Sequence, residues 1–387
     1  MKRIYLDHGA SMPLDDRVLK AMNGYMLDYG NPSSLHTEGR AGKKLVEEAR
    51  ERVAKLIGAE DPQNIIFTSS ATEANNIAIH GVARRNKGKG NHVITSAIEH
   101  MSVVNPVKDL SKNGFDVTFV PVSPEGIVDP EKIKEEISDK TILISIMYAN
   151  GEIGTIEPVG EIGGIAKDSG IYFHSDCVAA GGRISIDVDK DNLDLVTLSS
   201  NDIYGPRGVG ALYIRKGVKI QPITYGGGQE RGLRSGTENV YSLAGMGKAA
   251  EIAMAEMKEE SARLTKLRDR LIDGVLGRID ETYLTGHRTL RLPHHASFRF
   301  SYIEGESIIL TLDMEGISAS TGSACSSKTL EPSHVLISLG LKHEEAHGSL
   351  VLTLGHANTE EDVDYALEVI PRTVERLREM SPLYKKK

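Results

Sequence analysis

Polar and ionisable side chains recur in this sequence where short apolar runs end. They lie at Ser69–Thr72, Glu99–His100, Asn150, Asp176 and Ser199–Asp202. Hydroxyls and backbone N–H groups at a strand-to-helix junction can hold a phosphate. A flat imidazole, a carboxylate at a neighbouring strand end and a second hydroxyl-rich turn complete the set of groups that pyridoxal phosphate requires. The array therefore predicts a pyridoxal phosphate site, in which the carboxylate keeps the ring nitrogen protonated and the ring accepts electrons from a substrate carbon.

Each member of this array also has a plainer interpretation. The hydroxyls of "SSATEANN" are what a helix N-cap uses. A lone histidine such as His100 is usually structural, and Asp176 alone is a generic strand-end carboxylate. Only their occurrence together favours the cofactor site.

Two other sequence motifs do not lie in the structural context that their usual function requires. "KHEEAH" contains His-Glu-x-x-His at 343–347, a zinc-peptidase pattern. A strand-like run, "GSLVLTLG", follows it in place of a long helix and a third ligand. "GMGKAA" at 245–250 fits Gly-x-Gly-x-x-Ala but lies inside a helical pattern, so it indicates close helix packing rather than a dinucleotide site.

Cys325 is placed among small residues in "STGSACSSKTLEPSH". A cysteine can be a small buried hydrophobe. The glycine, serine and lysine neighbours instead predict an exposed loop, where a thiol is a candidate nucleophile or metal ligand.

The amino-acid composition limits the classes of protein to which this chain can belong. The chain has 387 residues, 26% charged and 40% hydrophobic, which is typical of a globular protein with a substantial core. Its net charge of −8 argues against a nucleic-acid surface. We expect no signal peptide and no membrane span, because no apolar run is long enough. Two cysteines cannot form a disulfide framework, which favours a reducing cytoplasm.

The elements that position these residues alternate between strand and helix. "NIIFTSS", "NHVITSAIEH", "TILISIMYAN" and "IYFHSD" are strand-like, and helical runs separate them. This pattern predicts an α/β fold with a mostly parallel sheet, whose ligands lie beyond the carboxyl ends of the strands. A long helix over about 241–277 leads to a smaller α+β part. We expect a large domain over 16–257 and a small domain made of 1–15 and 258–387.

Taken together, the motifs resemble cysteine desulfurases of the NifS/IscS type, which are fold-type I, class V members of the pyridoxal-phosphate aminotransferases. The resemblance runs from "YLDHGAS" to "MSPLY", and its specific pieces include "GNPSSLHTEG", "FTSSATEANNIAI", "SAIEHMSV", "ANGEIGTIEP", "YGPRGVGALYIR", "GGGQERGLRSGTENV" and "TGSACSSKTLEPSHVL". It implies a pyridoxal phosphate transferase fold with a large domain and a smaller α+β domain.

The resemblance also implies roles for individual residues. Ala71, Thr72 and Ser199 would hold the phosphate, and Asn201 would add to the affinity. His100 would stack on the ring, and it joins Cys325 as a catalytic candidate. Asn150 would lie beside the ring and the substrate carboxylate, and Asp176 would pair with the ring nitrogen. Thr237 would reach the phosphate of a second subunit in a homodimer, and Cys325 would take sulfur from L-cysteine as a persulfide.

Three departures from the family pattern affect the reaction. The Schiff-base lysine, which also moves the substrate Cα proton, is replaced by Asp202, and a carboxylate cannot form an imine. A glutamine that contacts the ring hydroxyl is replaced by Ala179. In the family's Arg-x-x-Leu-Gly-Arg motif, Val351 replaces the arginine that clamps the substrate carboxylate, and His356 replaces the second arginine.

Two hypotheses follow. In the first, the chain binds pyridoxal phosphate without a covalent link and is impaired in desulfuration. It then serves iron–sulfur cluster assembly as a sulfur carrier or scaffold, and Cys325 is a ligand of a [2Fe–2S] cluster shared with an IscU-type partner. In the second, it is an active desulfurase that uses another base, for which Lys328 is the nearest candidate.

Overall fold

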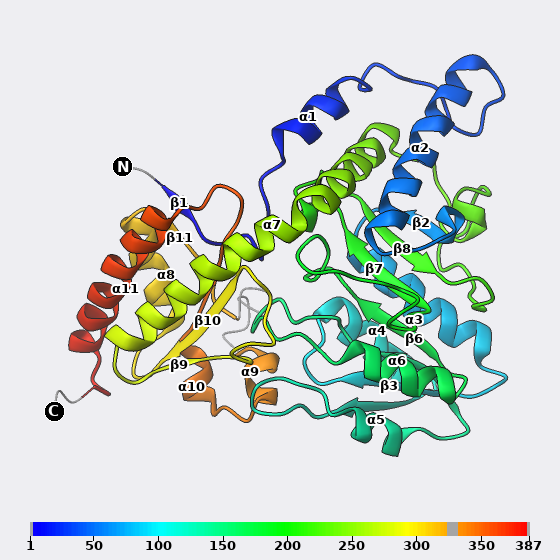
Figure 1. Cartoon of the computed structure of the whole chain (residues 1–387). Helices are drawn as coiled ribbons and strands as arrows, with labels where there is room; N and C mark the ends of the chain where they lie inside the picture. Colours follow the sequence, from blue (N-terminus) through cyan, green and yellow to red (C-terminus); the bar gives the residue numbers. More distant parts are fainter. Residues whose placement is uncertain (1–2, 323–331, 385–387) are drawn as a thin grey trace.

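The computed structural model of the chain describes residues 3–322 and 332–384. Its larger part is built on a seven-stranded sheet with the order β2-β8-β7-β6-β5-β3-β4 (Figure 1). The strands are β2 (Ile65–Thr68), β3 (His92–Ser96), β4 (Asp116–Val120), β5 (Thr141–Ser145), β6 (Tyr172–Asp176), β7 (Leu195–Ser199) and β8 (Gly210–Ile214). All neighbours pair in parallel except β8, which is antiparallel to β2 and β7. The predicted mostly parallel α/β sheet is therefore confirmed.

Helices cover both faces of this sheet because alternate strand residues point to opposite sides. Ile66 and Val93 pack with apolar residues of α3 (Ala71–Asn86) and α4 (Met101–Lys112). Their neighbours Phe67 and Ile94 pack on the other face. That face carries α2, α6 and the first half of α7. The remaining bounds in this part are α1 (Asp16–Asn23), α2 (Thr37–Leu56), η1 (Pro62–Asn64), α5 (Pro130–Glu136), α6 (Val159–Asp168), η2 (Asn201–Ile203) and η3 (Glu230–Gly232).

The smaller part has its own core. Ile4 and Leu6 pack there with residues from Leu264 to Val374, so the start of the chain belongs with its end. The elements are β1 (Ile4–Tyr5), β9 (Thr282–Leu284), β10 (His295–Phe300), α8 (Gly305–Met314), β11 (Ile317–Ser318), α9 (His334–Ser338), α10 (His343–His347), β12 (Ser349–Thr353) and α11 (Glu360–Met380). They form a β12-β10-β9 sheet and a β1-β11 pair beside helices.

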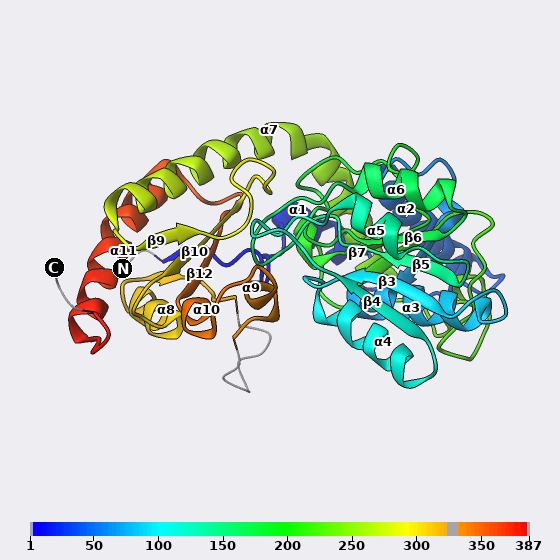
Figure 2. The same ribbon diagram turned by 90° about the horizontal axis from the view of Figure 1, so that it is seen from below.

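One helix, α7 (Val240–Arg278), runs along both parts (Figure 2). Its bounds agree closely with the helix expected over 241–277. Because α7 is continuous across the join, the domain limits at 15/16 and 257/258 stay a prediction. The His-Glu-x-x-His motif forms the five-residue α10 immediately before β12. Among the described residues, no helix has both the length and the apolar character needed to cross a bilayer.

Candidate active site

The first helix turn after β2 presents backbone donors at the carboxyl edge of the sheet. Ser70 caps α3, its hydroxyl accepting from the N–H of Glu73 at 3.2 Å. The preceding N–H groups, those of Ala71 and Thr72, have no partner within the helix and lie at the positive end of its dipole. This arrangement suits an anion such as a phosphate.

Gly210 allows β8 to approach this turn closely. A Cβ at Gly210 would lie 2.5 Å from the carbonyl carbon of Ser70 and 2.8 Å from the nitrogen of Ala71. Gly210 pairs with Thr68 on one side and with Ser199 on the other. The ends of β2 and β7 therefore lie on either side of one small residue, which brings Ser199 near the start of α3.

Asp176 and His100 are joined by a buried hydrogen-bond network. Asn75 Nδ2 donates to Asp176 Oδ2 at 2.7 Å and to Ser102 Oγ at 2.8 Å. Ser102 Oγ lies 2.7 Å from His100 Nδ1, and the N–H of Ser102 donates to the same nitrogen at 3.1 Å. His100 Nδ1 is thus an acceptor, so the proton of the neutral ring is on Nε2.

The Asp176 carboxylate receives two donors. Its second oxygen, Oδ1, accepts from the N–H of Val178 at 3.0 Å. These two donors fix the orientation of the carboxylate that is predicted to pair with the pyridine nitrogen. Asn75 and Ser102 are not among the site residues that the sequence pattern predicts. The only signal was that Asn75 follows the start of α3 by one helical turn.

Asp202, in η2, is partly buried at the same edge of the sheet. Its carboxyl interacts with the side chains of Ser199 and Asn201, and it faces Arg183 and Asp176. Burial raises the pKa of the Asp202 carboxyl to about 6, Arg183 opposes that rise and Asp176 adds to it. Asp202 therefore introduces a second carboxyl beside Asp176.

The N-terminal segment contacts this turn from the other side. Ser11 Oγ donates to Asn201 Oδ1 at 3.3 Å, and Arg207 Nη2 donates to Ser11 Oγ at 2.6 Å. The side-chain oxygen of Asn201 is therefore already occupied in the single chain. Its amide side chain also hydrogen-bonds the Asp202 carboxyl, so the predicted contribution of Asn201 to cofactor affinity stays a prediction.

Asn150 stabilises the loop formed by residues 149–156. Its Nδ2 donates to the carbonyl of Ile98 at 2.9 Å, and its Oδ1 accepts from the N–H groups of Glu152 and Ile153 at 2.8 and 3.0 Å. Only 2% of Asn150 is exposed. The structure thus gives Asn150 a role in shaping the 149–156 loop, while the contact to ring and substrate stays a prediction.

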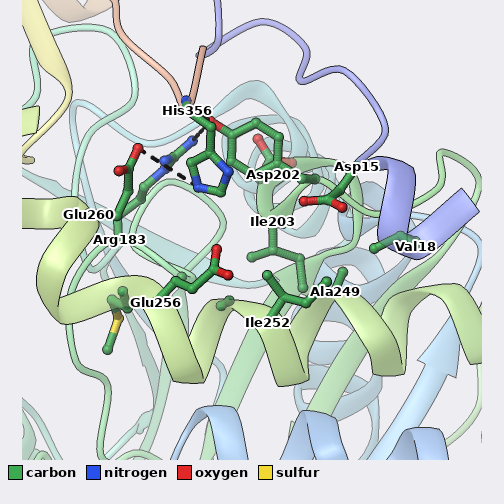
Figure 3. Close-up of a pocket in the computed structure, with 14 residues that line it drawn as sticks. Asp15, Val18, Arg183, Asp202, Ile203, Ala249, Ile252, Glu256, Glu260 and His356 are labelled. Carbon is green, nitrogen blue, oxygen red and sulfur yellow. Dashed lines mark hydrogen bonds and ion pairs between the residues drawn. The ribbon is translucent and has the colours of Figure 1, made fainter. Parts of the chain in front are cut away.

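A small cavity of about 20 Å³ lies between η2, α1 and α7, and Asp202 and Ile203 of η2 are among the residues that line it (Figure 3). Tyr204 stacks on His356 with ring centroids 4.1 Å apart, and the N–H of His356 donates to the Tyr204 hydroxyl at 3.0 Å. Arg183 lies over the Tyr204 ring at 5.2 Å. Figure 3 shows Arg183, Glu260 and His356 grouped at one end of the cavity. His356, which is predicted to replace the second family arginine, thus packs at the join between the two parts of the chain.

Val351 and Ala179 are the other two positions at which the sequence is predicted to depart from the family pattern. Val351 lies in β12 with 6% of its surface exposed, and its N–H donates to the carbonyl of Ser320 at 2.8 Å. Neither an isopropyl group nor a methyl group can bond a carboxylate or a ring hydroxyl. The Ala179 methyl is close to the 149–156 loop, since a Cβ added at Gly151 would lie 3.8 Å from it.

The described residues do not test the predicted roles of Thr237 and Cys325. Thr237 is exposed in the segment between η3 and α7. Its predicted contact with a second subunit stays a prediction. Cys325 lies outside the described residues, as does Lys328.

Comparison with known proteins defines the class. The Aminotransferase class-V family model matches residues 4–366, and the chain belongs to this family. Its fold is that of the pyridoxal-phosphate-dependent NifS-like structures.

Within that class, the similar proteins are cysteine desulfurases. The chain is 57% identical over 383 residues to cysteine desulfurase IscS 1 of Archaeoglobus fulgidus, covering 99% of this chain and 100% of the relative. It is 52% identical to cysteine desulfurase IscS of Clostridium botulinum, over 99% and 97% of the two chains. A NifS-like protein of known structure superposes with a TM-score of 0.91 at 38% identity, covering 97% and 100%. The apo cysteine desulfurase of Thermococcus onnurineus NA1 gives a TM-score of 0.87 at 25% identity, covering 97% and 95%.

Proposed function

We propose that this chain is a cysteine-desulfurase-family protein of iron–sulfur cluster assembly that retains the pyridoxal phosphate site but is impaired in desulfuration. The observation that carries the proposal is Asp202, a carboxyl at the position of the Schiff-base lysine, beside Asp176 and Ser199. We place the protein in the cytoplasm, because two cysteines are too few for a disulfide framework.

The donor set suits the cofactor in most respects. The N–H groups of Ala71 and Thr72 would bind the phosphate, with Ser199 beside them across Gly210. Asp176, fixed by Asn75, would hold the proton on the ring nitrogen. When bound, pyridoxal phosphate supplies an electron-accepting ring. The chain itself binds and orients that ring.

The chain lacks two groups that the reaction requires, a general base and a clamp for the substrate carboxylate. Loss of a positioned general base costs on the order of 10²–10⁴ in rate. Loss of a charge-assisted carboxylate clamp at Val351 removes about 1.5–3 kcal/mol of binding. Both changes act on the same substrate, so the chain should turn over little cysteine by the usual route.

The role that remains is sulfur transfer or cluster assembly. Cys325 would carry a transferable persulfide, or supply one thiolate to a [2Fe–2S] cluster held jointly with an IscU-type scaffold protein. The assembly would be a homodimer in which Thr237 reaches the partner's phosphate. These roles are supported by the family resemblance, since Cys325 lies outside the described residues.

An active desulfurase is the alternative. The names of relatives that are 45–57% identical over nearly the whole chain favour it. In that case another group, with Lys328 as the nearest candidate, would act as the base for L-cysteine.

Alanine release distinguishes the two. The wild-type chain, supplied with pyridoxal phosphate, L-cysteine and reductant, should release alanine at or near the background rate. The Asp202→Lys, Val351→Arg double variant should release it over several turnovers, because the base and the clamp are restored. Val351→Arg alone is the matched control and should stay inactive.

Omitting the reductant shows whether a persulfide must be reduced between turnovers. Multiple turnovers by the wild type would establish the alternative. An inert double variant that holds its cofactor would contradict the assignment of lost turnover to these two positions.

A further inference from the structure

Asp202 is a carboxylate without an ion-pair partner in the described part of the chain. Arg183 is the cation that faces it. Arg183 instead donates to the sulfur of Met12 at 2.9 Å and lies over the ring of Tyr204. The groups that contact the Asp202 carboxyl are the neutral side chains of Ser199 and Asn201. Because a partly buried carboxylate is stabilised by a nearby cation, the position is suited to a positively charged ligand group.

The sheet places this anion in a defined arrangement with two other charged features. Asp176 pairs in register with Thr197, two residues before the end of β7, and Asp202 follows that same end. Ser199 is opposite Gly210, which lies against the start of α3. Two carboxylates and one anion-binding helix terminus therefore share one edge of the sheet.

Pyridoxamine phosphate carries the complementary set of charges. At neutral pH its ring nitrogen and its C4′ amine can both be cationic, and its phosphate is anionic. We propose that the chain selects this amine form and that Asp202 pairs with the C4′ ammonium; this inference rests on the cofactor site of the proposed function. The ammonium would then occupy the place of the lysine amine that the chain has lost.

The aldehyde form is a poorer match for the same residues. Its C4′ oxygen is a hydrogen-bond acceptor, and so is an ionised Asp202. The two can bond only through an added proton, whereas the ammonium brings its own. A charge-assisted hydrogen bond of ordinary strength corresponds to a preference of about ten- to hundredfold.

Isothermal titration of the full-length protein, stripped of cofactor, measures this preference directly. Pyridoxamine phosphate and pyridoxal phosphate are titrated separately at pH 7.5. The wild type should bind the amine at least tenfold more tightly. Asp202→Asn, which keeps the shape and removes the charge, should abolish that ratio.

Asp194→Asn is the matched control. It makes the same aspartate-to-asparagine change at the opposite end of β7, because Asp194 immediately precedes this strand and Asp202 follows it. It should leave the ratio intact. If Asp202→Asn does not fold, Asp202→Ser gives the same readout. Equal binding of the two forms, or tighter binding of the aldehyde, would overturn the inference and leave the proposed cofactor site standing. Failure of both forms to bind would overturn the cofactor site as well.

Discussion

At the scale of single residues, the site is defined as much by supporting side chains as by those that would touch a ligand. Asp176 and His100 lie on different elements, and the Asn75 amide, with Ser102, links them. Asn75 is fully buried. A buried donor shared between two acceptors fixes both of their positions.

Asn75→Ala tests this role. It leaves the Asp176 carboxylate and the Ser102 hydroxyl without a shared donor, so unfolding free energy should fall by about 1–3 kcal/mol. Cofactor affinity should fall at the same time. Chemical denaturation and titration with pyridoxamine phosphate measure the two effects.

The neighbouring Asn76→Ala is the matched control. Asn76 is partly buried, and its amide donates to the carbonyl of Thr72 in its own helix at 2.9 Å. It should change both quantities little. Equal effects of the two substitutions would show that the network does not position the site.

At the scale of elements, the parallel strands made the candidate site predictable. Residues that end β6 and β7, and those that begin α3 and α4, must meet at one edge, and the sequence pattern identified them. Asn75 and Ser102 were not predictable, because they lie within helical runs and only the packing of α3 against α4 brings them together. The stacking of Tyr204 on His356 was not predictable either, because the two residues are 152 positions apart in the sequence.

Gly210 is the element-scale contact most open to test. In Gly210→Ala the new methyl would meet backbone atoms of Ser70 and Ala71, which cannot move aside as a flexible side chain can. Overpacking of this kind costs about 1–3 kcal/mol of unfolding free energy. It should also weaken phosphate-dependent binding, because the start of α3 must shift.

Gly164→Ala, in α6, supplies the comparison. Nothing lies within 4 Å of a Cβ there, and alanine favours the helix. Thermal unfolding should show unchanged or raised stability for this variant. A Gly210→Ala protein as stable as Gly164→Ala would contradict the close approach of β8 to α3.

At the scale of the whole molecule, the chain has the fold of its family, and our proposal places the change in chemistry at a few positions. The core of the smaller part holds the first residues of the chain together with the last ones. β12, with Val351, therefore belongs to the smaller part, whereas Asp202 belongs to the larger part. The altered positions therefore come from both parts of the molecule. Because the sheet and cores tolerate all of them, the fold alone does not establish desulfurase activity.

Borohydride reduction followed by mass measurement of the intact chain tests the central claim most directly. The wild type, saturated with pyridoxal phosphate, should give an unmodified chain, because Asp202 cannot form the imine that borohydride fixes. Asp202→Lys, treated identically, should gain one reduced cofactor per chain. A wild-type chain that carries one cofactor at a single lysine would contradict the account.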